Sequence, residues 1–173
     1  MAQPISISVL NEQLAEICEA GFHLMGPAQA KRTGKFRLFC KDQKKDLMVV
    51  FVAHADDKYV GHAKVVWDSD YPHFSKDRVP EIQDLNVLPA YRNQGIGTAI
   101  INACETQAFT RSNVVGIGVG LHPGYNNAQK LYPKLGYIPD GHGVHYGNQP
   151  VVERQTYIFD DDLVLFFRKS KAS

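Results

Sequence analysis

The sequence predicts a mixed α/β fold in which about six to seven strands form one mostly antiparallel central sheet, flanked by about four helices. Three observations support this prediction. The β-rich runs 47–55 and 59–67 are joined by Asp56-Asp57-Lys58, which is typical of an antiparallel hairpin. Strand and helix patterns then alternate over residues 81–135, as in a β-α-β-α unit. The last third of the chain returns to strand patterns.

The N-terminal part predicts one strand, one helix and an irregular segment. Residues 5–9 alternate polar and apolar side chains like a strand, and Asn11 is suited to cap a helix that runs to Ala20, with Gly21 as its stop. Residues 26–45 are basic, through Lys31, Arg32, Lys35 and Arg37, and poorly patterned. They predict a loop or an irregular helix flanking a cleft. The hairpin follows.

The rest of the chain predicts a polar loop over 68–80 and then the alternating unit. We expect a strand at 81–88, a helix from near Gly95 to about Ser112, a buried strand at 114–121 and a helix at 126–135 closed by Gly136. Residues 137–146 and 162–167 would add two strands. Because no repeat, low-complexity tract or linker separates these parts, we predict a single domain over residues 1–173.

Composition narrows the classes of function. A formal net charge of +1 gives no overall field for nucleic acid. Cys18, Cys40 and Cys104 are odd in number and lie in apolar surroundings, so they predict reduced core residues and a cytoplasmic location. No apolar run approaches the ~20 residues that cross a bilayer, and the N-terminus has no secretory pattern. We expect neither secretion nor insertion into a membrane.

The most informative motif is the stretch 92–98, between a predicted strand and a predicted helix. It consists of Arg92, Asn93, Gln94, Gly95, Ile96, Gly97 and Thr98. Two glycines allow the backbone to approach a ligand closely, and the N–H groups of a first helical turn suit a pyrophosphate. A G-x-G pattern alone is weak, but the strand before it, the bend at Pro89 and the helix after it predict a phosphate-binding turn.

With this turn, three ordered motifs resemble the GNAT superfamily of acyl-CoA-dependent N-acetyltransferases. Residues 92–97 fit its Q/R-x-x-G-x-G/A turn, and residues 85–91 are similar to the strand end that pairs with pantetheine. Residues 128–137, with the sequence AQKLYPKLGY, are similar to the family's A-x-x-L-Y-x-x-x-G-F/Y. Together the motifs cover roughly residues 81–138. The resemblance implies a GNAT-like sheet that is splayed between its fourth and fifth strands and admits the cofactor there.

The resemblance also implies acetyl-CoA as the acetyl donor and a set of residues that bind it. Many relatives carry asparagine seven positions ahead of the motif's tyrosine, where this chain has Tyr125 followed by Asn126 and Asn127. The implied cofactor-binding residues are Leu85, Asn86, Val87, Arg92, Asn93, Gln94, Gly95, Ile96, Gly97, Thr98 and Asn127.

Candidate catalytic residues follow from the chemistry of acetyl transfer, which needs a base for the amine and a donor for the leaving thiolate. Tyr132 stands where relatives place the hydroxyl that meets the sulfur; the alternative is a tyrosine packed in the core. The resemblance implies Glu81 as the first candidate for the base, because it precedes Arg92 by the same spacing as the catalytic glutamate in the histone-acetyltransferase branch of the family. Asp84 is the second candidate, and a solvated strand start would also explain Glu81. Strand alternation puts the two carboxylates on opposite faces, so only one can face the acetyl group.

Three histidines, His122, His142 and His145, could shuttle protons, line a substrate pocket or lie in turns. The spacing His142-Gly143-Val144-His145 resembles a metal pair, but no further ligand is in register, so no metal is predicted. The run Asp160-Asp161-Asp162 could attract a cationic amine or be a solvated turn.

The prediction for function is an acetyl-CoA-dependent N-acetyltransferase in which an amine attacks directly within a ternary complex. The acceptor could be a small metabolite, an antibiotic or a protein amine. The alternatives are a CoA-binding sensor without turnover and a Rossmann-type nucleotide binder, which would need a full G-x-G-x-x-G where this chain has Ile100. We expect no nucleic-acid or membrane partner, while edge strands near the C-terminus allow a homodimer.

Overall fold

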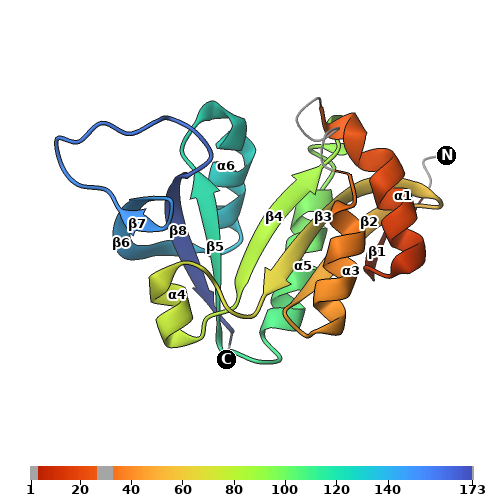
Figure 1. Cartoon of the computed structure of the whole chain (residues 1–173), viewed down its shortest axis with the longest axis horizontal. Helices are drawn as coiled ribbons and strands as arrows, with labels where there is room; N and C mark the ends of the chain where they lie inside the picture. The colour runs from red at the N-terminus through yellow and green to blue at the C-terminus, as the bar shows by residue number, and fades with distance from the viewer. Residues whose placement is uncertain (1–3, 27–32, 173) are drawn as a thin grey trace. The chain divides into compact units, whose positions relative to one another are not determined.

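A computed structural model describes residues 4–26 and 33–172 (Figure 1). Eight strands form one sheet in the order β1-β2-β3-β4-β5-β8-β6-β7, mostly antiparallel with one parallel pair, β4–β5. The strands are β1 Ser6–Val9, β2 Met48–Ala55, β3 Lys58–Val66, β4 Glu81–Val87, β5 Val114–Gly120, β6 Ile138–Tyr146, β7 Gln149–Pro150 and β8 Leu163–Ser170. The mixed α/β class is confirmed, with eight strands where six to seven were predicted.

The described residues contain five α-helices and three short 3-10 helices. The α-helices are α1 Glu12–Phe22, α3 Lys35–Lys44, α4 Pro72–Asp77, α5 Ile96–Ala108 and α6 Asn126–Lys134. The 3-10 helices are η1 His23–Met25, η2 Pro89–Tyr91 and η3 Pro123–Tyr125.

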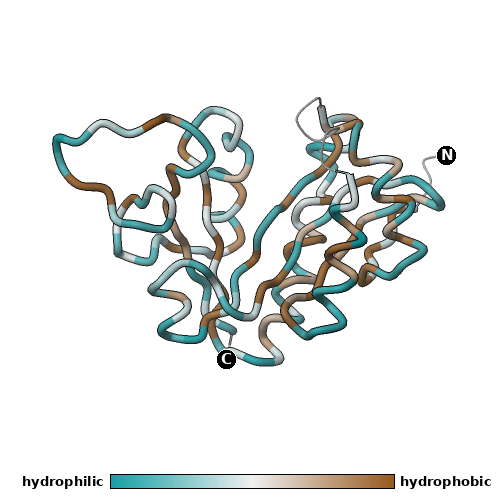
Figure 2. Tube along the Cα trace, viewed as in Figure 1, coloured by the Kyte–Doolittle hydropathy of each residue, from teal (hydrophilic) through white to brown (hydrophobic). Residues whose placement is uncertain are grey.

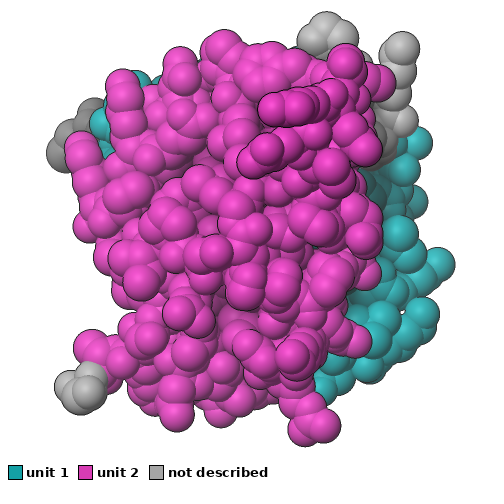
Figure 3. Space-filling view, turned by 90° about the vertical axis from the view of Figure 1, so that its left-hand side faces the viewer, with its two compact units in different colours: residues 1–66, 83–107 teal, residues 67–82, 108–173 magenta. Residues whose placement is uncertain are grey.

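The chain divides into two compact units, coloured separately in Figure 3. Unit 1 comprises Met1–Val66 and Gln83–Gln107, and unit 2 comprises Trp67–Ile82 and Ala108–Ser173. The boundary passes through β4, whose first two residues belong to unit 2. The organisation of the chain as a single domain stays a prediction.

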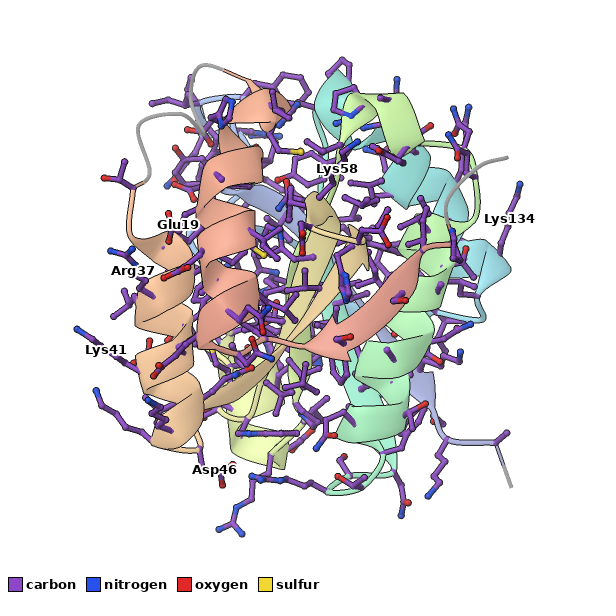
Figure 4. All side chains as sticks on the ribbon, turned by 90° about the vertical axis from the view of Figure 1, so that its right-hand side faces the viewer. Glu19, Arg37, Lys41, Asp46, Lys58 and Lys134 are labelled. Carbon is purple, nitrogen blue, oxygen red and sulfur yellow. The ribbon has the colours of Figure 1, made fainter. Side chains whose placement is uncertain are left out.

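In unit 1, β2 and β3 form the predicted antiparallel hairpin, and β1 pairs with the outer side of β2. Four consecutive residues of β2, from Val50 to Ala53, are buried. A strand buried on successive residues is covered on both faces. Helices α1 and α3 lie side by side on one face of these strands and α5 on the other (Figure 4).

Two helices of unit 1 differ from their predicted form. Asn11 caps α1 as predicted, since its side chain accepts a hydrogen bond from Leu14 N–H at 2.8 Å, but the helix continues through Gly21 to Phe22. Residues 35–44 form the regular helix α3, whose residues Phe36, Phe39 and Cys40 make a buried face at helical spacing. Lys31 and Arg32, also predicted for this basic segment, lie outside the described residues.

Helix α3 was hard to predict because its N-terminal cap comes from a distant residue. Its first position is preceded by Gly34, which has no side chain to cap it. The carboxylate of Glu19 in α1 accepts hydrogen bonds from the backbone N–H groups of Gly34 and Phe36, at 2.9 and 2.7 Å. In Figure 4, Glu19 lies beside the start of α3, while Arg37 and Lys41 point away from α1. A cap supplied from another helix leaves no local signal.

In unit 2, β8 lies between β5 and β6 and pairs antiparallel with both, extending the predicted strand to Ser170. The parallel pairs with β4 are Glu81 with Gly116 and Ile82 with Ile117. The predicted polar loop 68–80 contains the short helix α4, since Phe74 is buried against Tyr71 and Phe166. The long loop between β7 and β8 carries the exposed apolar residues Val152, Ile158 and Phe159 (Figure 2).

All three cysteines are unbonded and buried, as predicted. None of the helices in the described ranges combines the length and the apolar character needed to span a membrane.

Candidate functional site

The predicted phosphate-binding turn has the backbone geometry of an anion site. Asn93 and Gly95 have φ angles of 59° and 80°, in the left-handed region that favours glycine and asparagine. The first helical bond of α5 runs from Ala99 N–H to Gly95 C=O, at 3.0 Å. The N–H groups of Ile96, Gly97 and Thr98 therefore precede the helical ladder, at the positive end of the helix dipole, which favours an anion.

Side chains of the turn connect it to the end of β4 and to η2. Arg92 Nε donates to the carbonyl of Val87 at 3.0 Å, and Gln94 Nε2 donates to the carbonyl of Ala90 at 3.1 Å. The N–H of Leu88 donates to Val60 C=O of β3 at 2.8 Å. The structure thus brings together the predicted pantetheine strand and the predicted pyrophosphate turn, both within unit 1.

Asp84 interrupts β4 just before that strand end. Its φ angle is 60°, a left-handed conformation in the middle of a strand. Its carboxylate Oδ2 lies 2.6 Å from Lys35 Nζ and 3.1 Å from His62 Nε2. Asn86 Nδ2 donates to both Asp84 Oδ1 and the Asp84 carbonyl, at 2.8 and 2.9 Å. The predicted alternation of faces along this strand cannot be carried past Asp84 without correction, because a left-handed residue breaks the pleat.

The partners of Asp84 fix its charge state. Burial alone would raise the pKa of Asp84, but its hydrogen bond with His62 and the positive charge of Lys35 hold that pKa below its usual range. His62 is fully buried, which lowers its pKa and keeps the ring neutral, although Asp84 opposes this shift. A neutral ring that donates from Nε2 to Asp84 accepts at Nδ1 from Tyr59 Oη, which lies 2.6 Å away.

Glu81 and its partner Ser69 belong to unit 2. The Glu81 side chain is buried, with a relative exposure of 5%, and its Oε2 accepts a hydrogen bond from Ser69 Oγ at 2.5 Å. Ser69 Oγ in turn accepts from Tyr71 N–H at 3.0 Å. Glu81 is therefore not a solvated residue at a strand start. The role of Glu81 as a base stays a prediction.

Tyr132, also in unit 2, lies on α6 and is buried, with 4% exposure. Burial raises the pKa of Tyr132, so its hydroxyl is protonated at neutral pH. Asn127 lies in the first turn of the same helix. Tyr125, at the position where relatives carry asparagine, donates from its hydroxyl to Asp161 Oδ1 at 3.2 Å. Gln129 Nε2 donates to Gly120 C=O and so joins α6 to the end of β5.

The candidate histidines fall into two places in unit 2. His122 Nε2 lies 2.8 Å from Asp161 Oδ1, which connects the predicted acidic run to the loop after β5. The ring of His142 stacks on His73 at 3.5 Å between centroids, and His145 is buried beside Tyr71. Within the described part of the chain, no group of three or more His, Cys, Asp or Glu side chains is placed to hold a metal ion.

The family model of the GNAT acetyltransferases matches residues 12–137, which is more than half of the chain. The chain belongs to the GNAT family of acetyltransferases. Membership implies transfer of an acyl group from acyl-CoA, and it agrees with the three motifs of the sequence. The family match also includes the hairpin and α3, which the motifs did not cover.

Solved structures support the GNAT fold over nearly the whole chain. An N-acetyltransferase from Staphylococcus aureus Mu50 has a TM-score of 0.68 at 15% identity, covering 96% of this chain and 98% of that one. The ribosomal-protein-S18-alanine N-acetyltransferase from Escherichia coli has a TM-score of 0.66 at 14% identity, covering 98% and 96%. A chimeric spermidine N-acetyltransferase from Vibrio cholerae has 0.66 at 17%, covering 98% and 96%. At these identities the likeness establishes the fold alone.

Sequence reasoning missed four residues that surround the two candidate bases: Lys35, Tyr59, His62 and Ser69. A signal existed for His62, since it is a titratable residue inside an apolar strand run. Such a residue needs a partner when it is buried. Lys35 was noted only as part of a basic segment, and no local pattern pointed to its partner or to Ser69. Their partners lie 49 and 12 positions away (84 − 35 and 81 − 69).

Proposed function

We propose that this GNAT protein is an N-acetyltransferase that moves an acetyl group from acetyl-CoA to an amine by direct attack in a ternary complex. The observation that carries the proposal is the turn before α5, where left-handed Asn93 and Gly95 present the N–H groups of Ile96, Gly97 and Thr98 at a helix start. This geometry suits the pyrophosphate of CoA. When bound, acetyl-CoA supplies the acetyl group as an activated thioester.

The end of β4, before the turn, would hold the pantetheine arm and the thioester of acetyl-CoA. Backbone groups of Leu85, Asn86 and Val87 would pair with the pantetheine arm and polarise the thioester carbonyl. Asn127 at the start of α6 is the proposed additional contact to the cofactor. The three unbonded cysteines favour a reducing compartment such as the cytoplasm.

Proton transfer is assigned to two side chains. Glu81 would accept the amine's proton, directly or through water, and its hydrogen bond from Ser69 would hold the carboxylate in one orientation. Asp84 is the weaker candidate, because its lowered pKa and its ion pair with Lys35 reduce its proton affinity. Tyr132 would donate a proton or a hydrogen bond to the leaving sulfur, since burial raises its pKa and keeps its hydroxyl protonated.

The acceptor is proposed at the level of a chemical class, an amine. Two solved structures of similar fold are named for an alanine of ribosomal protein S18 and for spermidine, so both a protein amine and a small amine are reasonable acceptors. The carboxylates Asp160, Asp161 and Asp162 would favour a cationic amine. Asp161 already bonds to His122 and Tyr125 in the described structure.

Thermal unfolding with acetyl-CoA, CoA and NAD in parallel tests the cofactor. At a hundredfold excess over Kd, binding adds about 2.7 kcal/mol of stability, which for a chain of this length raises Tm by roughly 5–11 °C. A shift with the two CoA forms alone supports the proposal, and no CoA shift contradicts it. Thiol release with a panel of protein and small amines then tests turnover. CoA binding without release by any amine would favour the sensor instead.

A further inference from the structure

The left-handed conformation of Asp84 is accompanied by contacts from three side chains. A non-glycine residue at a φ of 60° is strained, and strain of this kind persists only where the surroundings fix it. All three oxygens of Asp84 are engaged: Oδ2 by Lys35 and His62, and Oδ1 and the carbonyl by Asn86. These contacts join three elements of unit 1, namely α3, β3 and β4.

Each partner is itself held in place. Lys35 is only 12% exposed, and its ammonium lies over the rings of Phe22, Phe36 and Phe39 at 4.2, 5.7 and 5.4 Å from their centroids. The Glu19 cap fixes the first turn of α3, from which Lys35 extends. A buried cation with this surrounding requires a fixed anion, and Asp84 supplies it.

The backbone beyond Asp84 also packs closely against β3. A Cβ added to Gly61 of β3 would lie 2.5 Å from the carbonyl oxygen of Asn86 and 3.2 Å from Val87 Cα. Only glycine allows β3 to approach β4 this closely. The segment Leu85–Val87 therefore lies between the contacts of Asp84 on one side and the bond from Leu88 N–H to Val60 on the other.

We propose that Lys35, His62 and Asp84 form a positioning clamp, which sets the direction of the backbone N–H groups of Leu85–Val87 and thereby the placement of the acyl donor. The three residues act through the backbone and do not touch the reacting atoms. The inference about the donor rests on the proposed function, whereas the inference about the backbone does not.

The test compares variants that separate charge from backbone conformation. Asp84→Asn keeps a residue that tolerates positive φ. An amide has only one acceptor oxygen, however, so its NH2 group must face one of the two donors, either the ammonium of Lys35 or the amide of Asn86. Lys35→Met removes the charge and keeps an apolar stem. Asp84→Gly removes every side-chain contact together with the strain. Leu14→Ala, in the core of unit 1 near the start of α1, controls for lost stability.

The first readout is hydrogen exchange of the backbone amides in the protein without ligand. We expect Asp84→Asn, Asp84→Gly and Lys35→Met to accelerate exchange at Leu85–Leu88, where the N–H of Leu88 donates to Val60 C=O, by about tenfold or more relative to the amides of β2. Leu14→Ala should not produce this effect. Unchanged exchange at these amides, or an acceleration as uniform as that of Leu14→Ala, would refute the clamp. An Asp84→Gly protein that exchanges like wild type would show that backbone conformation alone suffices, which also refutes it.

The second readout is steady-state kinetics with acetyl-CoA and a working amine. We expect a fall in kcat, or a rise in KM for acetyl-CoA, of about tenfold or more, with the KM for the amine nearly unchanged. Equal changes in both KM values with normal kcat would contradict the link to the donor. If wild type neither binds CoA nor releases thiol, the proposed function fails, and the exchange experiment still decides whether the clamp exists.

Discussion

Replacing Gly95 by alanine tests the phosphate-binding turn with little disturbance of the fold. A Cβ at this position meets no atom within 4 Å, so the substitution creates no clash. Its cost comes from the φ of 80°, since a left-handed residue other than glycine costs roughly 1–2 kcal/mol. For a chain of this size, that cost lowers Tm by about 2–8 °C. The variant should therefore fold.

Binding of CoA should fall much further than stability. We expect the new methyl group to take up space within the turn, where the pyrophosphate is proposed to lie. Hydrogen bonds to a charged group contribute roughly 1.5–3 kcal/mol each, so loss of one raises Kd by about 10- to 150-fold. Isothermal titration with CoA measures this change directly.

Gly143→Ala is a matched control for the strain. Gly143 has a φ of 75° and also has no atom within 4 Å of an added Cβ, but it lies in β6 of unit 2. It should lose similar stability and keep its affinity for CoA. If Gly95→Ala shows the same Tm loss as Gly143→Ala and binds CoA as tightly as wild type, the turn is not the pyrophosphate site.

Four further predictions concern single groups. Glu81→Gln keeps an acceptor for Ser69, so the protein should fold and bind CoA normally while turnover falls by about 10²–10⁴-fold; an unaltered pH–rate profile would exclude Glu81 as the base. Tyr132→Phe keeps the buried ring and should lower kcat by at most about 10²–10⁴-fold. A kcat that is unchanged at every pH would exclude Tyr132 as the general acid. Cys104→Ala should retain activity, because burial raises the pKa of the Cys104 thiol and no thiolate is available. If wild type traps an acetyl label and this variant loses it, the reaction passes through an acyl-enzyme instead. The folded-state pKa of Asp84 lies below the ordinary value of 3.8, so its carboxylate stabilises the fold above about pH 4 and ceases to do so as the pH falls through the folded pKa. Urea unfolding should show that Asp84→Asn is less stable than wild type at pH 7 and that this difference in unfolding free energy shrinks towards pH 2. A difference that stays constant with pH would contradict the ion pair.

Local chemistry explains which parts of the fold were predictable. The hairpin, β4, β5 and α6 were predicted because their periodicity and their flanking turn residues lie within the segment itself. The turn at 92–98 was predictable for the same reason, since its glycines and its helix start are contiguous. The regular helix α3 was not predicted, only a loop or an irregular helix, because Glu19 caps it from another helix. Helix α4 depends on Phe74 packing against Phe166, 92 positions later (166 − 74).

Asp84 shows why the site was only partly predictable. Alternation along a strand predicted a shared face for Asp84 and Asn86, but it carried no information about the left-handed conformation of Asp84 itself. Lys35 lies on α3 and His62 on β3, and their contacts with the Asp84 carboxylate lower its pKa. Its chemistry is set by tertiary partners, which a reading of β4 alone cannot include.

The same contacts bear on the choice between the two candidate bases. A base serves best when its pKa lies near the working pH, because it must be ionised and still bind a proton strongly. The partners of Asp84 lower its pKa, so it is ionised but a poor proton acceptor. Protonating it would also leave the enclosed Lys35 ammonium without its anion. Glu81 is buried and is bonded by the neutral hydroxyl of Ser69. We therefore propose that Glu81 transfers the proton and that Asp84 holds the strand.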